Sequence, residues 1–127
     1  MVKGIGIDMV RIERVDHLLR TLKEGALKRM FAEGELAAAD HNSRPAEYLA
    51  TRFAVKEAVF KAVAPLLPEK HFDLRLVETR NHEDGSPYVH ISEELSAILY
   101  KAHVSRLLVS ITTEGEYAAA FVTAVDD

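Results

Sequence analysis

The sequence has no cysteine among its 127 residues. This absence excludes disulfides, thiolate nucleophiles and zinc–cysteine sites, and it fits a reducing compartment. The sequence also lacks any apolar run close to the ~20 residues that a membrane-spanning helix needs. Its first residues lack the apolar core of a signal peptide. We therefore expect a soluble, cytoplasmic protein with no membrane partner.

A strong excess of charge of one sign is missing too. The formal net charge is −4 at neutral pH, so no overall field attracts nucleic acid, and an acidic partner must bind a local basic patch. Apolar residues make up 48% of the chain and charged residues 28%, which is typical of a globular protein. A chain of this length is expected to form a single domain over residues 1–127.

The most informative segment is a predicted helix over residues 45–64, whose centre reads RFAVKEAVFKA at positions 52–62. Pro45 suits the first helical position, and Pro65 and Pro68 stop the helix. Apolar residues lie nearly all round its axis, which is typical of a buried helix. We expect this helix to form the centre of the fold.

Charged side chains on this central helix need an explanation, because a buried charge is costly unless it is paired. Glu57 and Lys61 lie one turn apart and share a face with several alanines. Two readings stay open: an ordinary i,i+4 ion pair, or a site where the small alanines let another backbone, a metal ion or a phosphate approach. Arg52 and Lys56 form a second polar pair on a different side.

The chain begins with a period-two pattern over residues 2–10 that predicts a strand, with Asp8 and Ile7 on opposite faces. Gly4 and Gly6 within a strand indicate a bulge or the close approach of another group. A dinucleotide-binding fingerprint would need a third glycine where this chain has Met9, so that reading is set aside.

The remaining segments are predicted to be short helices and strands. Amphipathic patterns predict helices over residues 11–24, ended by Gly25, over 32–40, and after the N-cap Ser92. Alternating patterns predict strands over 71–80 and 88–91, and a hairpin of strands 106–112 and 117–125 with Gly115 in the turn.

Taken together, GIGID at residues 4–8, Arg14 and the segment 52–62 resemble the holo-acyl-carrier-protein synthase type of 4′-phosphopantetheinyl transferase. GSPYV at 85–89, and VSIT at 109–112 followed by EYAAA, also match. The resemblance implies an α+β fold with a long central helix packed on a small, mainly antiparallel sheet. It also implies a homotrimer with active sites shared between neighbouring subunits.

The function implied by the resemblance is transfer of the 4′-phosphopantetheine arm of coenzyme A to a serine of an apo acyl carrier protein. The reaction is Mg²⁺-dependent, releases adenosine 3′,5′-bisphosphate and belongs to fatty acid biosynthesis. The resemblance assigns the metal to Asp8 and Glu57, and Mg²⁺ typically takes one or two carboxylates plus phosphate oxygens and water. Glu57 and Lys61 are the implied catalytic residues, although the base that deprotonates the serine is either Glu57 or a metal-bound water.

Substrate contacts follow from the same resemblance. The residues implied to bind coenzyme A are Arg52, Phe53, Lys61, Thr112 and Thr113. The residues expected to meet an acidic carrier protein are Arg14, Arg20, Lys23, Lys28 and Arg29. Exposed basic residues on a helix are more often only a solvated face, and their spacing does not decide between the two readings.

Two positions depart from the family pattern. Members usually follow the Lys-Ala of the central helix with a Gly-x-Gly loop, where this chain has VAPLLP at 63–68, and many place a histidine where it has Thr113. The lost glycines keep a second hypothesis open, a non-catalytic module that binds carrier proteins. A third is a different Mg²⁺-dependent phosphoryl enzyme that acts on a small phosphate ester.

Overall fold

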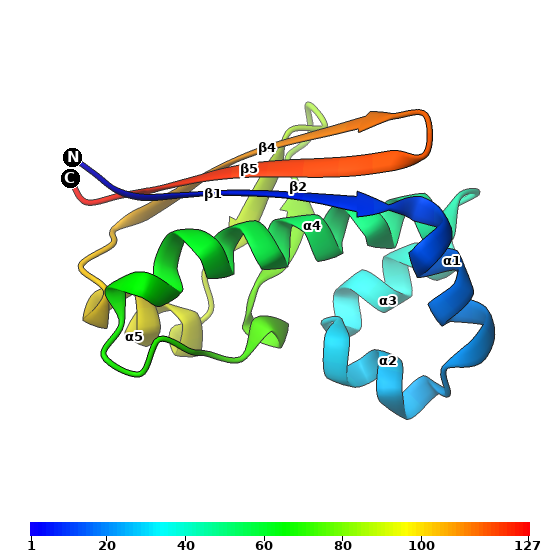
Figure 1. Cartoon of the computed structure of the whole chain (residues 1–127), viewed down its shortest axis with the longest axis horizontal. Helices are drawn as coiled ribbons and strands as arrows, with labels where there is room; N and C mark the ends of the chain where they lie inside the picture. The colour runs from blue at the N-terminus through cyan, green and yellow to red at the C-terminus, as the bar shows by residue number, and fades with distance from the viewer.

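The computed structural model describes all 127 residues and has the expected α+β architecture (Figure 1). Its elements follow one another as β1 (Val2–Arg11), α1 (Ile12–Thr21), α2 (Glu24–Met30), α3 (Glu33–Asp40), α4 (Pro45–Val63), η1 (Ala64–Leu66), η2 (Leu74–Leu76), β2 (Glu78–Asn81), β3 (Pro87–His90), α5 (Glu93–Lys101), β4 (Arg106–Glu114) and β5 (Tyr117–Val125).

A three-stranded antiparallel sheet in the order β1-β5-β4 covers one side of α4, as Figure 1 shows. The predicted hairpin between β4 and β5 is confirmed, and Gly115 in its turn has a φ of 58°, which favours glycine. The first and last strands are neighbours, so the chain ends meet: the Met1 amino group donates to the Asp126 carbonyl at 2.7 Å. A second sheet consists of β2 and β3 alone.

The long helix α4 matches the predicted 45–64 segment closely and begins at Pro45 as expected. Glycines let strand β1 lie directly on its backbone. A Cβ added to Gly4 would come within 2.1 Å of the Ala62 carbonyl oxygen, and one added to Gly6 within 1.9 Å of the Ala58 oxygen. The alanines of α4 and the glycines of β1 are therefore explained by the close approach of two backbones.

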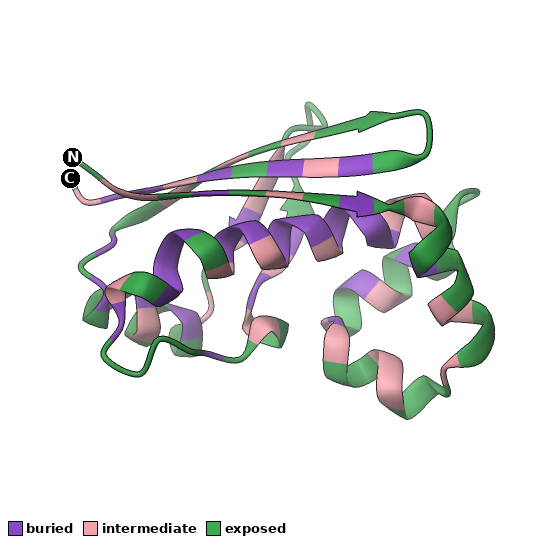
Figure 2. Ribbon diagram, in the orientation of Figure 1, coloured by how far each residue is buried: buried purple, intermediate pink, exposed green.

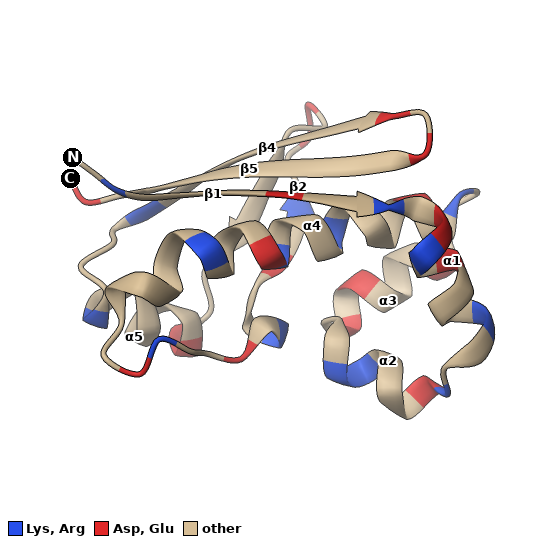
Figure 3. Ribbon diagram, in the orientation of Figure 1, with Lys and Arg blue, Asp and Glu red and all other residues tan.

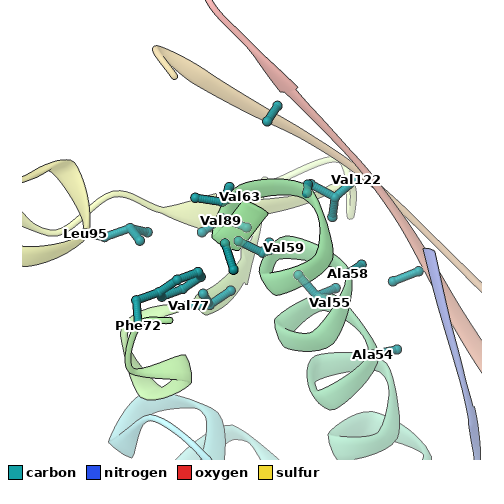
Figure 4. Close-up of a cluster of buried hydrophobic side chains, with 14 of the residues drawn as sticks. Ala54, Val55, Ala58, Val59, Val63, Phe72, Val77, Val89, Leu95 and Val122 are labelled. Carbon is teal, nitrogen blue, oxygen red and sulfur yellow. The ribbon is translucent and has the colours of Figure 1, made fainter. Parts of the chain in front are cut away.

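Buried apolar side chains surround α4 on its other sides (Figures 2 and 4). Val55, Val59 and Val63 are fully enclosed and pack with residues from the small sheet, α5 and the segment before η2. Each such side chain contributes roughly 1.5–3 kcal/mol by leaving water. Most sides of α4 are covered, so the helix is held firmly in place. The residues on its one exposed side are therefore held in place too.

Two predicted segments are wrong in detail. The helix predicted over 11–24 ends early, at Thr21, and Gly25 lies inside the next helix, α2, instead of ending α1. The alternating residues 71–80 form the single turn η2 and only then the short strand β2. Asp73 explains the turn, since its carboxylate accepts a hydrogen bond from the Arg75 N–H at 2.9 Å and so caps η2.

Arg52 and Lys56 lie on a different side of α4 from Glu57 and Lys61, as expected, and Lys56 forms a buried ion pair with Glu35 of α3 at 2.7 Å. Both side chains are at most 1% exposed. Burial lowers the pKa of Lys56, and the charge of Glu35 opposes this shift. Glu35 also accepts N–H bonds from Ala32 and Thr79, so the pair joins α3 to α4 and β2.

Candidate active site

Asp8 lies on the face of β1 that covers α4, two positions beyond Gly6, as the period of two requires. Its side chain is 16% exposed and faces Lys61, whose ammonium lies 3.2 Å from Asp8 Oδ1. The same ammonium donates to the Ile7 carbonyl at 2.9 Å. Residues more than fifty positions apart in the sequence thus meet at the edge of the strand–helix contact.

Glu57 lies half-buried on α4, one turn before Lys61. Its pKa is raised, first because burial removes water from the carboxylate and second because the Asp8 carboxylate repels it. Lys61 and Arg14 oppose this shift with their positive charges. Glu57 has no ion-pair partner within 4.0 Å, so the simple i,i+4 pairing with Lys61 does not form.

The oxygen ligands at this position fit a hard divalent cation whose coordination shell is completed by other ligands. Asp8 and Glu57 offer carboxylate oxygens, the ligands that Mg²⁺ prefers. Their mutual repulsion is the kind of charge imbalance that such a cation relieves. No cluster of three or more His, Cys, Asp or Glu residues is present that would hold a metal without outside help. Two carboxylates plus substrate oxygens and water is the arrangement that these residues suit.

Arg52 is placed on another side of α4 and is only 5% exposed. Its guanidinium lies 4.1 Å from the centre of the Tyr48 ring and donates to the hydroxyl of Thr51 and the side chain of Asn81. No carboxylate pairs with it, and its Nε has no partner in the chain. Phe53, the next predicted contact, is half-buried.

Thr112 and Thr113 lie far from Asp8 within the sheet. They belong to β4, and β5 separates β4 from β1, so the two outer strands lie roughly 10 Å apart. Thr112 pairs with Ala119, which in turn pairs with Met9. The side chain of Thr112 therefore lies on the same outer face of the sheet as Met9, whereas Asp8 lies on the inner face. Both threonines are exposed. Thr113 pairs with Ala118, which pairs with Val10, so Thr113 lies on the other face of the sheet, and one copy of the chain keeps both threonines two strand spacings from β1.

The five predicted carrier-binding residues lie on or beside α1 and α2, at one end of the molecule, where Figure 3 shows basic residues interspersed with acidic ones. All five are exposed. Arg20 pairs with Asp16 at 3.2 Å and Lys28 with Glu24 at 3.5 Å, so two of the five charges are already partly compensated within their own helices. Arg14 alone of the five also acts on Glu57.

Two cavities flank these regions. One of about 840 Å³ lies between α1, α2, α3 and the start of α4; it contains Lys28 but none of the predicted metal or coenzyme residues. The other, of about 390 Å³, lies at the carboxyl end of α4 and is lined by Phe60, Lys61, Ala64, Pro65 and Lys70. Lys70 is not predicted from the sequence, since no spacing rule relates it to Lys61 across the intervening loop.

Comparison with known proteins shows the family to which the chain belongs. The family model described as the 4′-phosphopantetheinyl transferase superfamily matches residues 4–122. The chain is 38% identical over 122 residues to the holo-[acyl-carrier-protein] synthase of Thermodesulfovibrio yellowstonii, covering 96% of this chain and 97% of that protein. It is 34% identical over 122 residues to the enzyme of the same description from Ruthia magnifica, covering 96% and 95%.

Solved structures of holo-[acyl-carrier-protein] synthases have the same fold as this chain. The crystal structure of holo-[acyl-carrier-protein] synthase from Neisseria meningitidis superposes with a TM-score of 0.87 at 29% identity, covering 99% of this chain and all of that one. The structure of the Bacillus anthracis protein, in complex with CoA (3′,5′-ADP), superposes with a TM-score of 0.77 at 29% identity, covering 100% and 99%.

The chain belongs to the 4′-phosphopantetheinyl transferase superfamily. Within that class it is an enzyme of the holo-[acyl-carrier-protein] synthase group, a phosphopantetheinyl transferase with the α+β fold of that group. No helix in the structure combines the length and the apolar character that crossing a bilayer requires.

Proposed function

We propose that this single-domain, cytoplasmic enzyme transfers the 4′-phosphopantetheine arm of coenzyme A to a serine of an apo acyl carrier protein, in support of fatty acid biosynthesis. The serine oxygen attacks the phosphorus that bears the pantetheine. The bond from that phosphorus to the bridging oxygen breaks, and adenosine 3′,5′-bisphosphate leaves with the bridging oxygen. The serine proton passes to a base, either Glu57 or water.

This proposal rests on one observation: Asp8, Glu57 and Lys61 lie close together, although they come from two distant segments of the chain. Asp8 and Glu57 are the residues that would hold Mg²⁺, which when bound supplies positive charge to the phosphate oxygens in phosphoryl transfer. Lys61 neutralises negative charge on the phosphate oxygens with a single ammonium group at the end of a flexible side chain. Its present contact with Asp8 leaves the other carboxylate oxygen, Oδ2, without an ion pair.

Coenzyme binding is assigned to Arg52, Phe53, Lys61, Thr112 and Thr113. Arg52 supports this assignment because a buried guanidinium without a carboxylate partner favours an anionic ligand. Solved relatives include complexes with coenzyme A, among them that of the Bacillus anthracis protein. Carrier binding is assigned to Arg14, Arg20, Lys23, Lys28 and Arg29, whose exposure and charge suit an acidic protein surface.

A homotrimer is the assembly we propose for this enzyme. The outer face of the β1-β5-β4 sheet exposes large apolar side chains, with Ile5, Ile7 and Met9 each more than 60% exposed and Phe121 beside them on β5. Contiguous apolar surface of this kind marks an interaction site. Contact through this face would let Thr112 reach the substrate of a neighbouring subunit. Light scattering after size-exclusion chromatography tests this, and a monomer would remove the shared site.

One experiment tests the activity. The chain is incubated with coenzyme A, Mg²⁺ and an apo carrier protein, and the intact carrier is weighed by mass spectrometry, with a chelator in a parallel sample. We expect the carrier to gain the mass of one phosphopantetheine only when Mg²⁺ is available. Carrier binding without any gain in mass would contradict the proposal, as would release of phosphate from small esters without a carrier.

A further inference from the structure

The cavity at the carboxyl end of α4 adjoins the candidate active site through Lys61. This side chain lines the cavity and also contacts Asp8. Two of the five lining residues, Lys61 and Lys70, are cationic, and the other three are apolar. No carboxylate lines the cavity, although the chain as a whole carries a net charge of −4. The cavity therefore has the character of a site for an anion attached to an apolar group.

Lys70 is held in an unusual way beside this cavity. Its φ is 56°, a left-handed conformation that side-chain-bearing residues rarely adopt. Its backbone N–H donates to the Leu67 carbonyl at 3.2 Å, and its ammonium donates to the Pro65 carbonyl at 2.6 Å. Both ends of the residue are thus fixed by the loop. An ammonium has three donors, so two remain for a ligand after the bond to Pro65.

The loop between α4 and Lys70 has few other donors for an anion. Pro65 and Pro68 lack an N–H, and the N–H of Leu67 is already bonded to the Ala64 carbonyl at 3.1 Å. The ammonium group of Lys70 is therefore the one cation that this loop presents, and Lys61 adds a second from α4. Phe60 gives the cavity an apolar wall and is itself anchored against Phe72, with ring centres 5.7 Å apart.

We propose that Lys70 and Lys61 form a binding subsite for a phosphate of the nucleotide half of coenzyme A, with Lys70 as a substrate-binding residue. This inference depends on the proposed function for the identity of the ligand. Charge-assisted hydrogen bonds from ammonium to phosphate are among the strong ones. Removal of Lys70 should therefore weaken binding of the coenzyme much more than it slows the transfer step.

The test compares Lys70→Ala and Lys70→Gly with the wild type. Glycine accepts a φ of 56° without strain, so Lys70→Gly keeps the loop even if Lys70→Ala perturbs it. Lys101→Ala, at an exposed position in the last turn of α5, is the matched control. We expect KM for coenzyme A to rise about 10-fold in both Lys70 variants, with kcat within about twofold, and no change in the control.

3′-Dephospho-coenzyme A shows which phosphate Lys70 binds. If KM for this analogue is the same in wild type and Lys70→Gly, Lys70 binds the 3′-phosphate. If KM rises equally for both substrates, Lys70 binds the diphosphate. Either pattern supports the subsite, whereas an unchanged KM for coenzyme A in an active Lys70→Gly enzyme overturns it.

A titration of adenosine 3′,5′-bisphosphate by calorimetry separates this inference from the proposed function, because it needs no turnover. We expect its affinity to fall about 10-fold in Lys70→Gly and to stay unchanged in Lys101→Ala. A wild type that binds the bisphosphate through Lys70 but labels no carrier would contradict the proposed function alone. Equal affinity in wild type and Lys70→Gly would contradict the subsite alone.

Discussion

The ammonium of Lys61 lies 3.2 Å from Asp8 Oδ1 and not within ion-pair distance of Glu57, although Glu57 precedes it by one turn on the same helix. A local i,i+4 pair is worth only a few tenths of a kcal/mol, so a tertiary contact readily replaces it. The consequence is that Glu57 stays half-buried, close to a second carboxylate and without a partner. This unbalanced carboxylate is the electrostatic signature of the site.

The pH dependence of stability should reveal this imbalance. Burial and the Asp8 charge raise the pKa of Glu57 above its ordinary value of 4.5. A carboxyl with a raised folded-state pKa contributes stability below its unfolded pKa, and this contribution is lost as pH rises through the folded pKa. Ionised Glu57 therefore destabilises the metal-free fold at neutral pH. We expect Glu57→Gln to raise Tm at pH 7 and to leave Tm unchanged near pH 4, measured by thermal unfolding with a chelator present. A lower Tm at pH 7 would contradict this reading.

Close packing of β1 on α4 predicts that Gly6 tolerates no side chain. The Cβ of Gly6→Ala would lie 1.9 Å from a backbone oxygen of Ala58, so no rotamer change relieves the clash. We expect a loss of at least about 1–3 kcal/mol in the free energy of unfolding, measured by urea denaturation. Gly25→Ala is the matched control, since it lies in α2 with open space around it, and it should gain up to about 0.5–1 kcal/mol. Equal stability of Gly6→Ala and wild type would refute the close contact.

The buried pair of Glu35 and Lys56 predicts a strongly non-additive mutant cycle. Lys56→Met leaves a buried carboxylate without its cation, which costs about 3–5 kcal/mol. Glu35→Gln removes that charge while an amide oxygen still accepts an N–H bond. We expect the double variant to be more stable than Lys56→Met alone, as measured by chemical denaturation. If the effects of the two single changes simply add, the pair is not energetically coupled.

Carrier recognition through α1 and α2 predicts a change in KM more than in kcat. Reversal of charge at Lys28 and Arg29 replaces attraction of an acidic carrier by repulsion. We expect KM for the carrier to rise about 10-fold and its dependence on salt to flatten, because repulsion at these two positions offsets the attraction from the remaining basic residues, and salt screens both. Charge reversal at Lys101, on α5, serves as the control and should have no effect. An unchanged KM in the double reversal would count against this surface.

Local patterns predicted much of this fold. The alternation in residues 2–10, the proline-bounded apolar run of α4 and the glycine turn between β4 and β5 each act over short distances, and each element formed as expected. The break between α1 and α2 was predicted a few residues too late, because Gly25 is compatible with a helix end and with a helix interior. The segment 71–77 alternates like a strand, but the Asp73 cap turns it into η2.

The residues that make up the site were easier to predict than the tertiary contacts between them. Asp8, Glu57 and Lys61 were identified by resemblance, whereas the direction in which Lys61 points depends on how β1 lies across α4. Glu35 was overlooked as a partner for Lys56 because the two lie 21 positions apart, with a loop between them. Lys70 was overlooked because its relation to Lys61 arises from the path of the loop after α4.

The most direct test of the account is the intact mass of an apo carrier protein after incubation with coenzyme A, Mg²⁺ and either wild type, Asp8→Ala or Glu57→Ala. Circular dichroism and Tm verify that both variants fold. We expect the wild type to add one phosphopantetheine and both variants to add none, since each loses one of two carboxylates proposed to hold the cation. Full labelling by either folded variant would contradict the assignment of Asp8 and Glu57 as a shared metal site.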